Sequence, residues 1–177
     1  MMKFTPLFAV CLLAAAVAVP AAANQTVYRT TLSGANESPA NASPAFGDAL
    51  VTLDDAAFTV AVHVTFSGLS APAAAGHIHC CTAVPGAGNI GVFVSFKDFP
   101  AAISGTYDNT LTLASAAFNT LLTGVVDGRS YVNIHSANFP AGEIRGFLAA
   151  VPEPSTYALI LGGLGLAGLV ARRRRAG

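Results

Sequence analysis

Three histidines have the residue type and spacing that could do chemistry in this chain. His77 and His79 are separated by one residue, and His135 ends the segment Tyr131–His135. Residues two apart in a strand point to the same face with Cα atoms roughly 6.6 Å apart, so His77 and His79 present their imidazoles together. His135 faces away from the two aliphatic residues of its segment, and it supplies a third nitrogen if the two strands are neighbours. Three imidazoles with an open position suit copper or zinc.

The same histidines also fit a structural role, in which they hydrogen-bond backbone carbonyls and nearby Asn or Ser groups. A metal site needs the three nitrogens within about 4 Å of one common point, whereas a structural role lets them diverge. The fourth histidine of the central region, His63, is expected alone on the outer face of a strand.

Cys80 and Cys81 directly follow His79. Adjacent strand residues point to opposite faces, so we expect Cys81 on the histidine side, where it would be a soft ligand that favours copper. In an oxidising compartment the alternatives are a vicinal disulfide between Cys80 and Cys81, an intermolecular bridge, or two free thiols.

Other catalytic constellations are weak. The serines lack the G-x-S-x-G context of a nucleophile elbow, and pairs such as Asp54-Asp55 and Asp127-Gly128 are typical of turns. We assign no catalytic residue and do not predict an enzyme outside the metal hypothesis. Between residues 24 and 151 four basic side chains stand against eight acidic ones, a net charge of about −4, so we expect no nucleic-acid partner.

Residues 1–23 predict a secretory signal peptide. Lys3 precedes an apolar stretch over residues 7–19, which ends at Pro20 and three alanines. Cleavage before Asn24 would remove Cys11 and leave a domain over residues 24–151 and a tail over residues 152–177.

The tail combines a short polar motif, an apolar run and a basic cluster. Its apolar run, residues 157–171, would make a helix of roughly 22 Å, shorter than the ~30 Å hydrocarbon core of a membrane. We expect a transient anchor in the inner membrane, with the basic end on the cytoplasmic side. The motif and the cluster are Pro152, Glu153, Pro154, Arg172, Arg173, Arg174 and Arg175.

This order of features resembles the PEP-CTERM sorting signal of Gram-negative bacteria. The resemblance implies recognition by exosortase-type machinery, removal of the tail near Pro152–Pro154, and delivery to the cell surface or extracellular matrix. A permanent single-span anchor is the alternative.

The central domain is predicted to be all-β. Alternation of Phe58, Val60, Val62, Val64 and Phe66 with polar or small residues is typical of a strand with one core face. One helix is expected after an N-cap at Ser115, with Gly124 at its stop. We expect a Greek-key β-sandwich or flattened barrel of about seven or eight strands. The other expected strands are Thr26–Ser33, Ala45–Leu53, Ala75–Cys80, Ile90–Phe96, Ile103–Leu113, Ser130–Ser136 and Glu143–Ala150, and residues 34–44 are expected to form an exposed loop.

Three segments resemble the CHRD domain, the module named for its repeats in chordin: Gly76-His77-Ile78-His79, Tyr131–His135 and Pro140–Gly146. The resemblance spans about Tyr28 to Ala149 and implies an extracellular all-β domain. Alternation independently places Glu143 and Arg145 on an outer face, as a surface pair worth under ~1 kcal/mol.

The G-H-I-H segment is also similar to the copper-binding strand of copper-zinc superoxide dismutases, with His135 in a place comparable to a later copper ligand. No further histidine or aspartate follows for a bridging ligand or a zinc site, and Arg145 is the one nearby candidate for the arginine of that family. We therefore expect a secreted structural or binding protein of the cell surface, in contact with polysaccharide or proteins of a biofilm matrix. The alternative is a copper-dependent redox protein that uses His77, His79 and His135.

Overall fold

The computed structural model describes residues 25–152, 159–165, 167 and 171–172. Nine antiparallel strands form one sheet, in the order β5-β4-β7-β8-β1-β2-β3-β6, and the short β9 also pairs with β1. The strands are β1 (Gln25–Ser33), β2 (Phe46–Asp54), β3 (Thr59–Ser67), β4 (Ala73–His79), β5 (Val92–Ser95), β6 (Gly105–Thr112), β7 (Tyr131–Ser136), β8 (Ile144–Phe147) and β9 (Ala149–Ala150), with a 3-10 turn η1 (Gly34–Asn36) and one helix α1 (Ser115–Val126).

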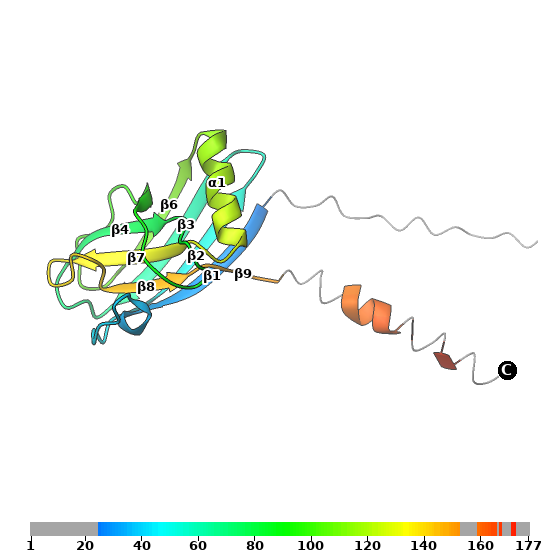
Figure 1. Cartoon of the computed structure of the whole chain (residues 1–177), viewed down its shortest axis with the longest axis horizontal. Coiled ribbons are helices and arrows are strands. Elements are labelled where there is room, and N and C mark those ends of the chain that lie inside the picture. Colours follow the sequence, from blue (N-terminus) through cyan, green and yellow to red (C-terminus); the bar gives the residue numbers. More distant parts are fainter. Residues whose placement is uncertain (1–24, 153–158, 166, 168–170, 173–177) are drawn as a thin grey trace, which may run out of the picture.

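The expected class, mostly β with a short helix, is confirmed, but the sheet is not split into a two-sheet sandwich. A single curled antiparallel ladder brings the half made of β4, β7 and β8 against the half made of β1, β2, β3 and β6 (Figure 1). The two halves bury one continuous apolar cluster, to which Ile78 and Val132 contribute from one side and Val51 and Val62 from the other. The two halves join where β8 meets β1 through the single pair Ser33 and Arg145.

The period-two pattern positions β3 as expected. Val60, Val62, Val64 and Phe66 are buried, while His63 is exposed on the outer face. Phe58 is not part of the strand, because it lies in the preceding turn with a φ of 53°. Asp54 stabilises this turn by accepting hydrogen bonds from the backbone N–H groups of residues 56 and 57.

The helix boundaries differ from those expected. Ala114 occupies the N-cap position, and α1 continues past Gly124 to Val126. Phe118 and Leu121 are buried as expected, but Gly124 serves close packing: a Cβ there would overlap the sulfurs of Cys80 and Cys81. Gly128, with a φ of 66°, follows the helix end instead.

Cys80 and Cys81 form a vicinal disulfide in the structure. Both sulfurs lie against α1, near the carbonyl oxygen of Thr120. The expectation that Cys81 shares the histidine face is wrong, because β4 ends at His79 and strand alternation does not extend to the cysteines.

The start of β1 and the end of β9 lie at the same end of the sheet (Figure 1). β9 pairs with β1, and the Val151 N–H donates to the Val27 carbonyl at 2.9 Å. Residues 159–165 of the tail are helical, and no helix among the described residues is long and apolar enough to span a membrane. The signal peptide, Glu153, Pro154 and Arg173 to Arg175 lie outside the described residues, so the domain boundaries and the transient anchor stay predictions.

Replacement of Gly124 by alanine tests the packing of α1 on the disulfide. In an exposed helix this change stabilises by about 1 kcal/mol. Here the added methyl group must displace both sulfurs, so we expect a loss of roughly 1–3 kcal/mol in the free energy of unfolding, measured by urea denaturation. Gly91→Ala is the control, because a Cβ at Gly91 meets nothing within 4 Å; a Gly124→Ala protein as stable as this control would contradict the packing.

Candidate metal centre

The antiparallel pairing of β4 with β7 brings the three histidines together. His77 pairs with Asn133, His79 with Tyr131, and Ala75 with His135. Because residues opposite each other in a ladder share a face, the side chains of His77, His79 and His135 all project from the same side of the sheet. Gly76, which directly precedes His77, lies close to the rings of Phe96 and Phe99, because a Cβ added at Gly76 would meet them at 2.7–2.8 Å.

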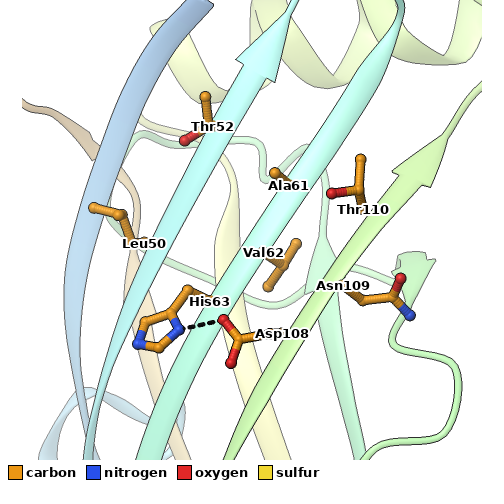
Figure 2. A pocket seen from close by; sticks show the side chains of 8 residues that line it. All are labelled: Leu50, Thr52, Ala61, Val62, His63, Asp108, Asn109 and Thr110. Atoms are coloured by element: carbon orange, nitrogen blue, oxygen red, sulfur yellow. Dashed lines mark hydrogen bonds and ion pairs between the residues drawn. The ribbon is translucent and has the colours of Figure 1, made fainter.

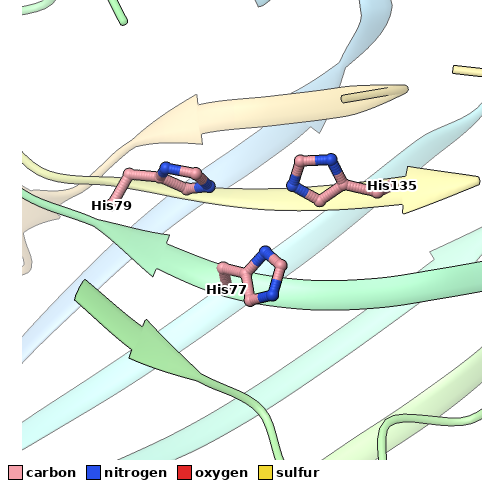
Figure 3. A group of neighbouring side chains, drawn as sticks. All are labelled: His77, His79 and His135. Carbon is pink, nitrogen blue, oxygen red and sulfur yellow. The ribbon is translucent and has the colours of Figure 1, made fainter. Parts of the chain in front are cut away.

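One ring nitrogen from each histidine lies within 4.8 Å of the corresponding nitrogens of the other two. Figure 3 shows a nitrogen of each ring turned toward a common space. Three points this close together lie within about 2.8 Å of one centre, against a Zn–N bond of roughly 2.0–2.1 Å, so a small inward shift would complete the coordination of an ion.

Hydrogen bonds fix which nitrogens are free. His79 Nδ1 lies 2.8 Å from the Ile90 carbonyl oxygen, and His135 Nδ1 lies 3.0 Å from that of Pro140. A carbonyl only accepts, so each Nδ1 carries the proton and each Nε2 keeps a lone pair. Both Nε2 atoms, together with His77 Nδ1, are buried without a hydrogen-bond partner.

Burial keeps the three rings neutral. It lowers the pKa of His77 to about 4, with further lowering by the neighbouring His135 and His79. Burial also lowers the pKa of His79 and of His135, even though each donates to a carbonyl. Neutral imidazoles with free lone pairs are the form in which histidine binds a metal.

The cluster consists of imidazole side chains, so it offers only nitrogen atoms to an ion. Among the described residues, the one group of three or more His, Cys, Asp or Glu side chains placed to hold an ion is His77, His79 and His135. The arrangement matches a mononuclear site with a position left for a solvent or substrate ligand.

Arg145 and Glu143 do not form the expected surface pair. Arg145 is buried, its Nε donates to the Asn36 carbonyl at 2.6 Å, and its Nη1 donates to Asn89 Oδ1 at 2.6 Å. Glu143 is fully buried and accepts from Ser43 Oγ and the Ser70 N–H, both at 2.7 Å. The expectation was wrong because loops cover this face of the sheet, which alternation alone had assigned to solvent.

Residues 34–44, expected as an exposed loop, contribute a buried acid to the loops that cover this face of the sheet. The side chain of Glu37 is only 6% exposed, and its Oε2 lies 3.8 Å from Arg145 Nε. Burial raises the pKa of Glu37 to about 7, although Arg145 and the Ser38 N–H both favour the carboxylate.

Arg145 does not face the histidine cluster directly. Its guanidinium carbon lies 4.8 Å from the centroid of the Tyr131 ring, and the Tyr131 ring in turn stacks on His79 at 4.7 Å. An arginine beside the metal, as in the superoxide dismutase resemblance, is therefore separated here by one aromatic ring.

His63 lies apart from the cluster and has a partner. Its Nδ1 is 2.5 Å from Asp108 Oδ1 across β3 and β6, beside an open hollow of about 330 Å³ on the outer face (Figure 2). Both side chains are substantially exposed, so the pair is worth at most ~1 kcal/mol.

The sequence predicted the three histidines but missed the groups that orient them. The backbone carbonyls of Ile90 and Pro140 could not be predicted from residue type, because every residue has a backbone carbonyl. Tyr131 did carry a signal, since it shares a strand face with Asn133 and His135.

Fold and site together define a small antiparallel β domain with a neutral three-histidine cluster on one sheet face. The family model of the CHRD domain matches residues 28–148, and that of the PEP-CTERM protein-sorting motif matches residues 150–175. The chain belongs to the CHRD domain family, and the predicted resemblances to the CHRD domain and to the PEP-CTERM sorting signal are confirmed. It is an exported protein that is sorted through exosortase. Neither the curated proteins nor the solved structures contain a match.

The pH dependence of stability tests the burial of Glu37. Its folded pKa of about 7 exceeds the ordinary 4.5, so the stability contributed by the protonated form is present below pH 4.5 and is lost as the pH rises toward 7. Glu37→Gln does not titrate, so its free energy of unfolding relative to wild type should rise over this range by up to about 3 kcal/mol, at roughly 1.4 kcal/mol per pKa unit.

Glu143→Gln is the matched control. Hydrogen bonds from Ser136, Ser43 and Ser70 outweigh burial and lower the pKa of Glu143, so its contribution is lost only as the pH falls below about 4.5. Urea denaturation between pH 4.5 and 8 should therefore show a constant difference for Glu143→Gln. Parallel curves for wild type and Glu37→Gln would contradict a buried, protonated Glu37.

Proposed function

We propose that this exported domain binds one transition-metal ion through His77, His79 and His135. The observation that carries the proposal is the set of three convergent, buried nitrogens without hydrogen-bond partners. A buried polar atom left unpaired costs about 1–3 kcal/mol, and a metal bond would remove that cost at all three positions at once.

The ligand set favours copper or zinc, both of which imidazole suits. The sulfurs of Cys80 and Cys81 are bonded to each other and lie against α1, so neither cysteine offers a thiolate ligand to the metal. His79 and His135 each donate the second ring nitrogen to a carbonyl, the outer contact typical of metal-binding histidines. Bound copper would supply one-electron chemistry, whereas zinc would act without redox change.

Metal content tests this function directly. The purified exported protein, loaded with Cu²⁺ or Zn²⁺ and dialysed, should retain about one equivalent, and His77→Ala and His135→Ala should retain almost none. At 100 times its Kd the metal should stabilise wild type by roughly 2.7 kcal/mol.

His63→Ala is the matched control, because it removes a histidine that lies outside the cluster. Equal metal loss in His63→Ala, or no stoichiometric metal in wild type, would reject the site. A copper-loaded protein that accelerates superoxide decay, when the zinc-loaded form does not, would assign it to redox chemistry.

A structural role in an extracellular matrix is the second candidate. A polar hollow of about 540 Å³ has Thr30, Thr31, Asn36 and Phe147 among its lining residues. Hydrogen-bonding groups beside an aromatic ring suit a sugar polymer. Cosedimentation of the metal-free protein with the purified exopolysaccharide of the host would support this role, and its absence would remove it.

Processing of the tail has its own test. The domain makes its last described backbone hydrogen bond at Val151, directly before the Pro152-Glu153-Pro154 motif. We expect the mature protein in an exosortase-containing host to end near Pro154, as measured by intact mass. Glu153→Ala should leave the tail attached; an exported wild-type protein that keeps Arg172 to Arg175 would contradict processing.

A further inference from the structure

Tyr131 links the histidine cluster to the buried arginine. It pairs directly with His79 across β4 and β7, and the two rings stack with centroids 4.7 Å apart and planes 2° apart. The guanidinium carbon of Arg145 lies over the Tyr131 ring, 4.8 Å from its centroid. The ring of Tyr131 therefore contacts both His79 and Arg145, at similar distances from its centroid.

The Tyr131 hydroxyl also holds Ile90, the residue whose carbonyl orients His79. It donates to the Ile90 carbonyl at 3.3 Å and accepts from the Ile90 N–H at 3.4 Å. The same carbonyl accepts the Nδ1 proton of His79 at 2.8 Å. Tyr131 therefore acts on His79 in two ways. Its ring stacks on the imidazole, and its hydroxyl holds Ile90, whose carbonyl accepts the Nδ1 proton.

The segment that carries Ile90 needs such an anchor. Residues 83–92 are exposed, and strand β5 begins only at Val92. Arg145 Nη1 donates to the Gly88 carbonyl at 3.1 Å and to Asn89 Oδ1 at 2.6 Å, while Asn89 Nδ2 donates to the Ser38 carbonyl at 2.7 Å. Tyr131 and Arg145, both buried, thus hold three consecutive residues of an exposed segment.

We propose that Tyr131 is a positioning residue of the metal centre: it fixes the ring plane and the tautomer of His79, so that Nε2 faces His77 and His135 with a free lone pair. This inference rests on the proposed metal function. Without the hydroxyl, Ile90 loses two contacts, its carbonyl moves relative to His79 Nδ1, and the proton is free to shift to Nε2. That shift would block the atom that binds the metal.

The experiment compares Tyr131→Phe with Tyr107→Phe in the exported protein. Tyr107 is a matched control, because it is also buried, and its hydroxyl has no hydrogen-bond partner. Two readouts are needed: the Kd for Cu²⁺ or Zn²⁺ by competition with a chelator, and the imidazole ¹⁵N resonances of His79 in the metal-free protein.

We expect Tyr131→Phe to bind about one equivalent with a Kd raised 10- to 100-fold, the usual effect of removing an outer-shell partner, and to show a mixture of His79 tautomers. Wild type and Tyr107→Phe should share one Kd and a single Nδ1–H tautomer. Unchanged affinity and an unchanged tautomer in Tyr131→Phe would overturn the assignment and leave Tyr131 as a packing residue.

The two proposals fail separately. A wild-type protein that binds no metal removes the metal centre, and the tautomer of His79 in the metal-free proteins still decides whether Tyr131 positions that ring. If Tyr131→Phe does not fold, Asn89→Ala releases the same segment from its exposed side. Movement of Ile90 with the released segment should raise the Kd and mix the His79 tautomers, and a metal-free wild type in which His79 is not a single Nδ1–H tautomer would overturn the assignment.

Discussion

The antiparallel register between β4 and β7 is the constraint on which the site depends. It sets Tyr131 opposite His79 and His135 opposite Ala75, so that the alternation of each strand sends three imidazoles to one face. A slip of one residue would turn His135 toward the apolar core and Ile134 outward. The register is held by the complete burial of Ile78, Val132 and Ile134 on the opposite face. The same hydrophobic contacts therefore stabilise the fold and assemble the cluster.

A second layer of buried polar groups covers the outer face of β4, β7 and β8. Arg145 of β8 donates to loop oxygens, and Glu143, directly before β8, accepts from loop hydroxyl and N–H groups, so the two side chains bind loop atoms instead of each other. Buried charges are tolerated when they are hydrogen-bonded, and these two have several partners each. Loops at the edge of this layer also orient the histidines, because the Ile90 and Pro140 carbonyl oxygens accept the Nδ1 protons of His79 and His135. This construction keeps the three imidazoles neutral and oriented, which is the form in which histidine binds a metal.

Local patterns predicted much of the fold. The alternation of apolar and polar residues predicted β3 and the shared face of His77 and His79, and turn residues predicted where strands end. Alternation could not show that β4 and β7 are neighbours, since pairing depends on contacts between segments more than 50 residues apart. It also assigned Glu143 and Arg145 to solvent, because covering loops leave no periodic signal. The predicted side of Cys81 was wrong for a related reason. β4 ends at His79, directly before the disulfide, so the alternation of side chains in β4 does not determine where Cys81 points. Gly124 showed that a helix-stop residue can instead be a packing requirement.

The chain thus combines an export signal with a three-histidine cluster, for which we propose a metal-binding role. X-ray absorption of the copper- or zinc-loaded protein tests the central claim most directly, because it counts and identifies the atoms bound to the ion. The account predicts three imidazole nitrogens at roughly 2.0–2.1 Å and a light fourth ligand from solvent, with no sulfur. Sulfur in the coordination shell, or fewer than three imidazoles, would contradict a centre built by His77, His79 and His135.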